Sequence, residues 1–289
     1  MKWIVTGAGG FVGKALCKRL LEIGEEVRIM PREMLTSFFS MEEYLYNERP
    51  DYIVHLAAYG NYHDQTDIDG IYAVNVDYLL NLLQASKNID YKGFINFSSS
   101  SVLGGKSTGM RSDDFPETDT FYGASKLAGE YLCYSFGRQF HKPIVSVRPF
   151  SITGIGEQSN HLIPTLIRSC LYGEEMPFVG SPSHDFIDID DVVRAILCIS
   201  KEISVPIMHR PVHLGNAKGY SNNAVKNIVE RVTGKMANLK SVKKLRSYDS
   251  PRWRNSSYDK SIIKALYKWE PQKSLKKSIR EMVNHELTT

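Results

Sequence analysis

The stretch TGAGGFVG, residues 6–13, decides how the chain begins to fold. It follows the short apolar run WIV and opens the amphipathic segment FVGKALCKRLLEIG (11–24), which ends in glycine. Short apolar runs are typical of buried strands, and a glycine directly after a periodic segment is typical of a helix end. The first thirty residues therefore predict a strand, a glycine-rich turn, a helix and, at VRIM (27–30), a second strand.

The same alternation continues along the chain. Short apolar runs recur at YIVHLAA (52–58), GFINFSS (93–99), PIVSVRPF (143–150) and PVHLG (211–215), with helix-like segments between them. Strands that alternate with helices predict a parallel sheet covered on both faces. We expect an α/β fold of the Rossmann type, with a doubly wound parallel sheet formed by residues 1–152 and 186–216. Residues 153–185 and 217–289 are expected to form a smaller, interleaved C-terminal domain.

The bulk composition is that of a soluble globular protein. Of the 289 residues, 42% are apolar and 24% are charged. No apolar run reaches the ~20 residues of a membrane span, and the N-terminus lacks the pattern of a signal peptide. We therefore expect a cytoplasmic protein with no membrane partner. The four cysteines are far apart and form no Cys/His cluster, which predicts reduced packing residues and no metal site.

Positive charge gathers near the C-terminus. Residues 235–280 contain fourteen Lys or Arg against three Asp or Glu, although the net charge of the whole chain is only +4. Such a stretch is compatible with solvated helix faces, with an anionic small ligand or with nucleic acid. Apolar residues interrupt the basic ones, which favours solvated faces and argues against a nucleic-acid partner.

The glycine-rich turn is placed where a dinucleotide phosphate would bind. Gly7 would form the tight turn, Gly10 would admit a pyrophosphate, and Gly13 would allow the helix to pack on the strand. The helix start, at Phe11 and Val12, would face the phosphates. The spacing is GxxGxxG, and the alternative is a merely tight structural turn.

The end of the second strand bears on the choice between NADP and NAD. An acidic residue that would hold the ribose 2′-hydroxyl of NAD is expected there. Pro31 and Arg32 stand at this place instead. Arg32 suits a 2′-phosphate and favours NADP, whereas Glu33 would serve NAD if the alignment slips by one residue.

A second motif, YGASK, places Tyr122 and Lys126 four residues apart. On a helix this spacing stacks the two side chains on one face, and the small residues between them leave room for a ligand. Taken alone, such a pair is more often a tyrosine on an ordinary amphipathic helix beside a solvated lysine.

Taken together, these motifs make the chain similar to the extended short-chain dehydrogenase/reductases, the family of nucleotide-sugar epimerases, dehydratases and ketoreductases. The resemblance covers nearly the whole length. It rests on TGAGGFVG and YGASK and, in the family's order, on HLAA (55–58), NV (75–76), SSSSVLG (98–104), RPF (148–150), DFIDIDDVVRAI (185–196) and HLGN (213–216).

The resemblance implies a catalytic triad. Tyr122 would exchange a proton with the sugar oxygen, and Lys126 would stabilise the phenolate and hold the nicotinamide ribose. A hydroxyl from the end of the fourth strand would bind the same sugar oxygen. Alignment from VLG assigns this role to Ser99, with Ser100 as the second choice; the alternative is that the serines merely end a strand.

Further contacts follow from the same resemblance. Cofactor contacts are implied for Leu56, Ala57, Ala58, Asn75 and Pro149, although plain packing is the competing interpretation of each. Substrate contacts are implied for Ser100, Ser151, Arg252 and Arg254, within a C-terminal domain that binds substrate. The acidic pair of the 4,6-dehydratases is missing, since Ser100 and Ser101 stand in its place.

We expect an NADPH-dependent reductase of a nucleotide-linked 4-keto-(6-deoxy)hexose. The first alternative is a nucleotide-sugar 4-epimerase with tightly bound NAD, and a remote one is an NAD(P)-sensing regulator without turnover. The intact Ser, Tyr and Lys argue against a sensor.

The family also implies a homodimer formed through two helices. Either dimer contacts or intrachain core would be formed by their residues Leu79, Leu82, Leu83, Leu127, Tyr131 and Tyr134.

Overall fold

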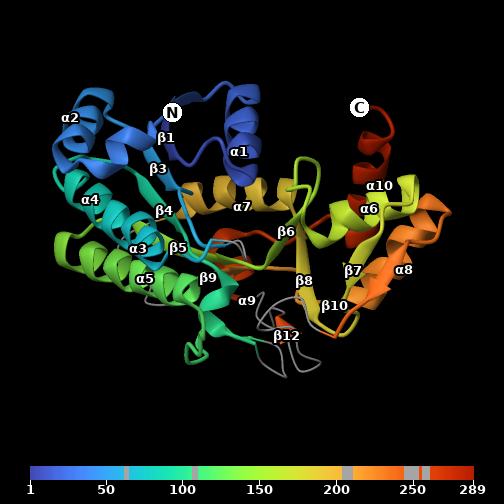
Figure 1. Ribbon diagram of the computed structural model, residues 1–289. Coiled ribbons are helices and arrows are strands. Elements are labelled where there is room, and N and C mark those ends of the chain that lie inside the picture. Colours follow the sequence, from blue (N-terminus) through green and yellow to red (C-terminus); the bar gives the residue numbers. More distant parts are fainter. Residues whose placement is uncertain (62–64, 106–109, 204–210, 244–253, 256–260) are drawn as a thin grey trace.

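The computed structural model describes residues 1–61, 65–105, 110–203, 211–243, 254–255 and 261–289. In this part of the chain, six parallel strands form the main sheet in the order β2-β1-β3-β4-β5-β9 (Figure 1). They are β1 (Lys2–Thr6), β2 (Glu26–Ile29), β3 (Tyr52–His55), β4 (Gly93–Phe97), β5 (Ile144–Pro149) and β9 (Val212–Leu214). Because β2 and β3 flank β1 on opposite sides, the strand order reverses there. The predicted doubly wound parallel sheet is confirmed, with its topological switch point between β1 and β3.

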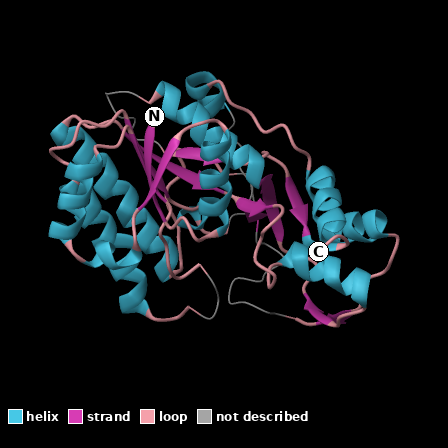
Figure 2. Cartoon of the chain, turned by 90° about the horizontal axis from the view of Figure 1, so that it is seen from above, coloured by secondary structure: helices cyan, strands magenta, loops and turns pink. Residues whose placement is uncertain are grey.

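Helices cover both faces of this sheet (Figures 1 and 2). One face packs on α1 (Phe11–Glu22) and α7 (Ile189–Glu202), and the other on α2 (Phe38–Glu48), α4 (Tyr78–Ala85) and α5 (Phe121–Phe140). Successive strand residues point to opposite faces. Ile4 accordingly packs with α2, α4 and α5, while Val5 packs with α1 and α7. Both faces are buried, which explains why these strands are apolar throughout.

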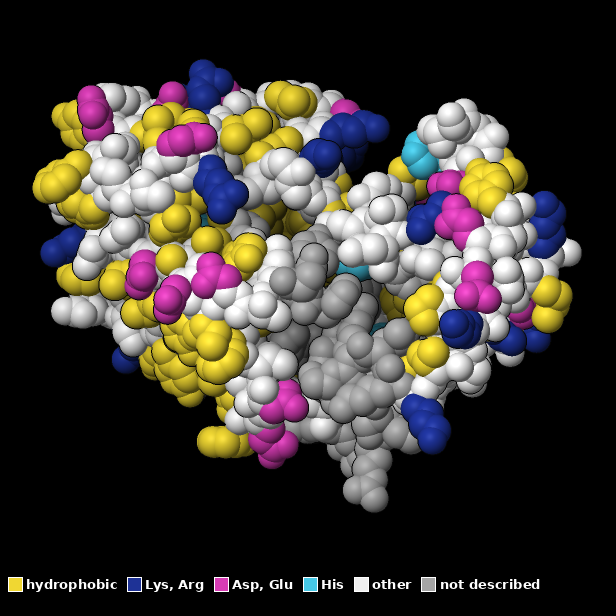
Figure 3. All heavy atoms as spheres, viewed as in Figure 1, with side chains coloured by type: hydrophobic (Ala, Val, Ile, Leu, Met, Phe, Trp, Pro, Cys, Tyr) yellow, Lys and Arg dark blue, Asp and Glu magenta, His cyan; other side chains and the backbone are white. Residues whose placement is uncertain are grey.

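Helices α4 and α5 differ in what they expose. Leu79, Leu82 and Leu83 on α4 are at most 1% exposed and pack inside the chain's own core. On α5, by contrast, Phe121 is 55% and Tyr131 is 51% exposed, and hydrophobic side chains gather over this region in Figure 3. The three leucines are therefore intrachain core, and the homodimer stays a prediction.

A smaller lobe contains two further sheets. In it β8 pairs with β6, β10 and β12, and β7 pairs with β11. Its elements are β6 (Ser151–Thr153), α6 (Leu162–Tyr172), β7 (Met176–Phe178), β8 (Ser183–Asp188), β10 (Gly219–Ser221), α8 (Asn222–Thr233), β11 (Leu239–Ser241), β12 (Arg254–Asn255) and α10 (Leu275–Glu286). Helices α6, α8 and α10 enclose a separate hydrophobic core. Between β8 and β10 the chain returns to the main sheet through α7 and β9, so the two lobes are interleaved in sequence. The domain boundary expected between residues 185 and 186 falls inside β8.

The smaller lobe is attached at one edge of the main sheet. β6 follows β5 directly, and β10 follows β9. Since the six strands are parallel, both connections leave from the carboxyl edge. The C-terminal segment is tied back onto α7, because Asp191 accepts hydrogen bonds from the backbone N–H groups of Gln272 and Lys273 at 2.9 and 2.8 Å. Helix α9 (Ser261–Tyr267) lies between these regions, against α7 and β9.

Three general properties of the chain bear on function. All four cysteines are free thiols, and Cys133 and Cys170 are buried. None of the described helices is long and apolar enough to cross a lipid bilayer. Among the described residues, no three His, Cys, Asp or Glu side chains form a cluster able to hold a metal ion.

Candidate active site

The glycine-rich turn between β1 and α1 has no room for side chains at two positions. Gly7 has a φ of +69°, and a Cβ there would lie 2.6 Å from the backbone N of Ala57. A Cβ on Gly13 would collide with the carbonyl oxygen of Gly7 and lie 2.5 Å from the Cα of Ala8. These glycines therefore allow the turn, the start of α1 and the end of β3 to pack directly against one another.

The start of α1 is open. Gly10 caps the helix without a side chain, and no side chain in the described residues accepts a hydrogen bond from the first turn. Gly9 and Gly10 are exposed, and a Cβ on Gly9 would meet no atom within 4 Å. Among the described residues, no side chain binds the first N–H groups of α1, at Phe11, Val12 and Gly13. These groups and the positive end of the helix dipole make the helix start a place for an anion such as a pyrophosphate.

Thr6, the last residue of β1, joins the two strands at the switch point. Its Oγ1 accepts hydrogen bonds from the backbone N–H groups of Leu56 and Ala57, both at 3.2 Å. Its own proton is then available to Nδ1 of His55, which lies 2.9 Å away. Burial, and secondarily the charge of Lys126, lowers the pKa of His55 to about 3, so this imidazole stays neutral. Neither residue has a predicted role, because nothing in the local sequence pattern pairs them.

The end of β2 carries the residues that bear on cofactor choice. Arg32 and Glu33 begin a short 3-10 turn, Arg32–Thr36, directly after Pro31, and both are exposed. Within the described residues the guanidinium of Arg32 forms no ion pair, whereas Arg28 is held by Glu26 and Glu48. In the described part of the chain Arg32 is thus a cation without an ion pair, directly after Pro31 at the end of β2.

The turn after β4 presents one of the predicted serines. Ser99 caps a 3-10 turn, Ser100–Leu103, and its Oγ accepts a hydrogen bond from the backbone N of Ser101 at 3.1 Å. Ser99 is half-buried, whereas Ser100 is only 7% exposed. Of the two candidates, Ser99 is therefore the one whose side chain a ligand reaches more easily.

The first turn of α5 abuts this serine turn. Thr120 caps the helix by accepting a hydrogen bond from the backbone N of Gly123 at 3.0 Å. A Cβ on Gly123 would lie 2.7 Å from the carbonyl oxygen of Ser101. Tyr122, half-buried in the same helical turn, is thereby brought next to the segment that carries Ser99. The glycine in YGASK thus serves close packing of the helix against the turn.

Lys126 lies one turn farther along α5 and is only 4% exposed. Within the described residues its ammonium group forms no hydrogen bond and no ion pair. Burial lowers the pKa of Lys126 to about 8, while Cys133 and Glu130 act in the opposite direction. The charged form still predominates at neutral pH. A buried ammonium without a partner is costly, and a ribose hydroxyl of a bound nucleotide would supply one.

Asn75 connects the segments around Tyr122 and Lys126. It lies in a π-helical turn, Ala73–Asp77, between α3 (Ile68–Tyr72) and α4. Its Nδ2 donates to the Ser125 hydroxyl at 2.9 Å and to the carbonyl of Tyr59 at 2.7 Å, and its Oδ1 accepts from the Tyr59 N–H. Ser125 in turn donates to the carbonyl of Tyr122. Asn75 therefore connects α5 to the segment after β3, and its contact with a cofactor stays a prediction.

The other predicted contact residues lie along the same edge or in the smaller lobe. Leu56 and Ala57 are half-buried and Ala58 is exposed, directly after β3. Pro149 ends β5, and Ser151 begins β6; both are half-buried. Arg252 lies outside the described residues. Arg254 belongs to β12, where its backbone pairs with Ser183 of β8.

These features fit a bound dinucleotide. The carboxyl edge of the sheet brings together the open helix start, the ammonium of Lys126, which has no partner among the described residues, and the Ser99 turn; they come from β1–α1, α5 and β4. The first would hold a pyrophosphate, the second a ribose, and Tyr122 and Ser99 would face a substrate oxygen beside it. The arrangement suits hydride transfer coupled to proton transfer at a carbon that bears an oxygen.

Comparison with known proteins agrees with this chemistry. A protein of Bacillus subtilis described as an uncharacterized UDP-glucose epimerase is 28% identical over 96% of this chain and 95% of its own length. GDP-6-deoxy-D-talose 4-dehydrogenase of Aggregatibacter actinomycetemcomitans is 30% identical over 76% of each chain. The crystal structure of UDP-glucuronic acid 4-epimerase from Bacillus cereus, in complex with UDP-glucuronic acid and NAD, superposes with a TM-score of 0.88 at 25% identity. That match covers 100% of this chain and 99% of the other.

The sequence model of the NAD dependent epimerase/dehydratase family matches residues 3–208, well over half of the chain. The fold, the glycine turn and the YGASK helix agree with this match. The chain therefore belongs to the NAD-dependent epimerase/dehydratase family of the extended short-chain dehydrogenase/reductases.

Proposed function

We propose that this enzyme reduces the C4 carbonyl of a nucleotide-linked 4-keto-(6-deoxy)hexose with NADPH. The observation that carries the proposal is Lys126, a buried ammonium without a partner in the described residues, one helical turn from Tyr122. A solvated lysine beside an ordinary tyrosine would be exposed. The burial instead favours a lysine whose charge acts on Tyr122 and on a bound ribose.

The proposed roles follow from the chemistry of each group. When bound, the nicotinamide supplies the hydride. Tyr122 donates its phenolic proton to the sugar oxygen, and the charge of Lys126 stabilises the phenolate that remains. Ser99 donates a hydrogen bond to the same oxygen and orients it. The open start of α1 binds the pyrophosphate through Phe11, Val12 and Gly13.

Two observations favour a reductase over an epimerase. Arg32 is exposed and without an ion pair in the described residues at the end of β2, which suits the 2′-phosphate of NADPH. One relative is a dehydrogenase that acts at C4 of a GDP-linked 6-deoxy sugar. Ser100 and Ser101 stand where a dehydratase would need an acid and a base, which argues separately against a dehydratase.

A 4-epimerase with tightly bound NAD is the second candidate. It is favoured by the structural similarity to a UDP-glucuronic acid 4-epimerase in complex with NAD. Glu33, exposed beside Arg32, is the residue that would hold the ribose 2′-hydroxyl in this case. Both candidates use Ser99, Tyr122 and Lys126, so the triad alone does not separate them.

Substrate contacts complete the proposal. Ser100 and Ser151 would approach the sugar from the carboxyl edge of the main sheet. Arg252 and Arg254, in the basic C-terminal region, would bind the diphosphate of the substrate through charge-assisted hydrogen bonds. The sugar would therefore lie between the main sheet and the smaller lobe.

The two candidates predict different nicotinamide balances. Purified protein is incubated with a panel of nucleotide sugars and their 4-keto-6-deoxy derivatives, each with NADPH and with NADH. A reductase consumes one NADPH per 4-ketosugar, seen as a loss of nicotinamide absorbance and as a C4 alcohol in the product NMR spectrum. Interconversion of two nucleotide hexoses with catalytic NAD and no net absorbance change contradicts the reductase and establishes the epimerase.

Arg32→Ala tests the cofactor assignment. We expect NADPH to bind more tightly than NADH to the wild type. The variant should narrow this preference by ~1 to 3 kcal/mol, because a charge-assisted contact to the 2′-phosphate is lost. Fluorescence titration with both cofactors measures the effect. Glu33→Ala is the matched control and should leave NADPH affinity unchanged; a preference for NADH in the wild type that Glu33→Ala weakens would reverse the assignment.

A further inference from the structure

A buried ion pair lies directly behind the triad. Glu130 on α5 and Arg148 on β5 are 6% and 3% exposed. Arg148 donates from Nε to Oε1 of Glu130 at 2.8 Å and from Nη2 to Oε2 at 2.7 Å, a bidentate contact. The hydroxyl of Ser98, also buried, donates to the same Oε1. One carboxylate thus receives hydrogen bonds from β5 and from the residue that directly follows β4.

The three partners are adjacent in sequence to residues of the candidate active site. Ser98 precedes Ser99, and Arg148 precedes Pro149 at the end of β5. Glu130 lies one helical turn after Lys126 on α5. The backbone N of Ser98 also donates to the carbonyl of Val147 at 2.8 Å, so β4 and β5 are already joined there. The carboxylate adds the connection from these strand ends to the helix that carries Tyr122 and Lys126.

A buried ion pair contributes little net free energy to holding a helix on a sheet, because both charges must be desolvated. Removing two charges from water costs several kcal/mol per ion, and apolar residues of similar volume often stabilise as well or better. What the pair supplies beyond packing is directional contact: a bidentate fork and a hydroxyl fix the helix relative to the strands. Hydride and proton transfer need reacting groups placed to within about 0.5 Å.

We propose that Glu130 is a positioning residue of the active site, which holds the Ser99 strand end and the Tyr122–Lys126 helix in register through Ser98 and Arg148. The inference rests on the proposed function, because it assigns Ser99, Tyr122 and Lys126 to the reaction. Glu130 itself touches neither substrate nor cofactor in this scheme.

Glu130 also acts on Lys126 electrostatically. The groups that bear on the Lys126 ammonium are Cys133 and Glu130 on its own helix and the neutral His55 at the end of β3. The carboxylate of Glu130 raises the pKa of Lys126, opposing the stronger effect of burial. Its removal should therefore lower the pKa of Lys126, so that the ammonium loses its proton at a lower pH.

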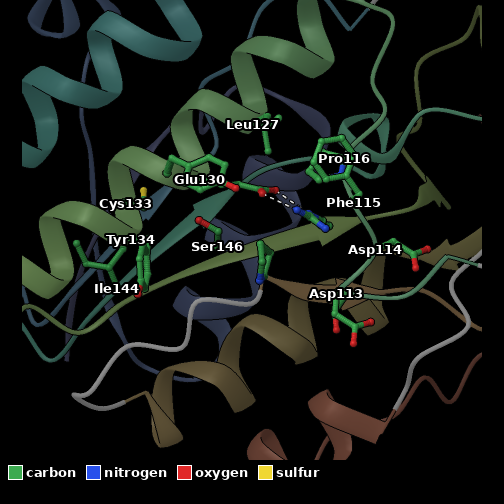
Figure 4. Close-up of a pocket in the computed structure, with 14 residues that line it drawn as sticks. Asp113, Asp114, Phe115, Pro116, Leu127, Glu130, Cys133, Tyr134, Ile144 and Ser146 are labelled. Atoms are coloured by element: carbon green, nitrogen blue, oxygen red, sulfur yellow. Dashed lines mark hydrogen bonds and ion pairs between the residues drawn. The ribbon is translucent and has the colours of Figure 1, made fainter.

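A cavity lies beside the Glu130–Arg148 ion pair, so side chains there can be substituted without overpacking the core. It has a volume of 320 Å³ and lies between α5 and β5. Figure 4 shows Glu130 and Ser146 at this cavity, with dashed lines from the Glu130 carboxylate marking its contacts. Because there is space beside these side chains, substitutions of similar or smaller volume should not overpack the core. Ser146, buried on β5, donates no hydrogen bond to Glu130 and offers a matched control.

The first experiment compares Ser98→Ala with Ser146→Ala. Each removes one buried hydroxyl, but only the first cuts the contact between the Ser99 strand end and Glu130. We expect Ser98→Ala to lower kcat by about 10-fold to 100-fold, with the KM values unchanged, and Ser98→Thr to recover most of the loss. Ser146→Ala should keep the wild-type kcat. Equal kcat values in Ser98→Ala and Ser146→Ala overturn the positioning role.

The second experiment removes the charges together. The double variant Glu130→Gln/Arg148→Met leaves no unpaired ion, keeps an acceptor for Ser98 and should stay folded by circular dichroism. We expect the alkaline limb of its pH–kcat profile to move to lower pH. The Lys126 titration, followed by ¹³C NMR of lysine-labelled protein without cofactor, should move in the same direction.

Turnover and the Lys126 titration together distinguish a failure of the proposed function from a failure of the role proposed for Glu130. A wild type that turns over no nucleotide sugar, combined with the expected Lys126 titration shift, removes the proposed function but keeps the coupling of Glu130 to Lys126. An active wild type in which Ser98→Ala and Ser146→Ala have equal kcat values overturns the positioning role and leaves the proposed function standing, whereas an unchanged Lys126 titration in the double variant removes the electrostatic coupling of Glu130 to Lys126.

Discussion

Tyr122→Phe is expected to lower turnover by at least ~10²-fold while cofactor affinity stays within the wild-type range. The substitution keeps the ring in the half-buried first turn of α5 but removes the proton that the sugar oxygen needs, and a lost general acid typically costs this much. Steady-state kinetics with the best substrate of the nucleotide-sugar panel give kcat, and fluorescence titration gives the Kd of the cofactor.

The matched control is Tyr131→Phe. Tyr131 lies on the same helix and is 51% exposed, so loss of its hydroxyl should leave kcat unchanged. Near-normal turnover in Tyr122→Phe would remove Tyr122 from the mechanism. A similar loss in both variants would instead indicate general damage to α5.

Gly13→Ala is expected to weaken cofactor binding by at least ~10-fold and to destabilise the fold by about 1 to 3 kcal/mol. The added Cβ would collide with the carbonyl of Gly7 and approach the Cα of Ala8, both of them backbone atoms that cannot rotate away. The turn must therefore shift, and the first amides of α1 move away from the pyrophosphate. Cofactor titration and thermal unfolding measure the two effects.

Lys18→Ala, five residues farther along α1, is the control for this variant. Its side chain is exposed and forms no ion pair in the described part of the chain, so its truncation should change neither affinity nor stability appreciably. Wild-type cofactor affinity in Gly13→Ala would show that the start of α1 does not bind the pyrophosphate.

Local patterns were enough to predict the fold class, and the family resemblance that they carry named the main candidates of the site. The apolar runs, the glycine spacing at residues 7–13 and the helical spacing of Tyr122 and Lys126 are properties of a few neighbouring residues, and secondary structure depends largely on such neighbours. The parallel sheet follows from the alternation of strands and helices. The family match confirms the assignment to epimerases and dehydratases.

Tertiary structure decided what surrounds those residues. Thr6 meets His55 across 49 positions of sequence, Ser98 meets Glu130 across 32, and Arg148 meets Glu130 across 18. No periodicity links such pairs, because they meet only when strands and helices pack. Burial is equally a property of the assembled layers. Packing of the layers places Leu79 in the core, leaves Ser99 more exposed than Ser100, and removes Lys126 from solvent. The sequence by itself therefore determined which groups are available for the chemistry, while packing determined their protonation, their partners and their accessibility, since desolvation and long-range contacts exist only in the folded chain.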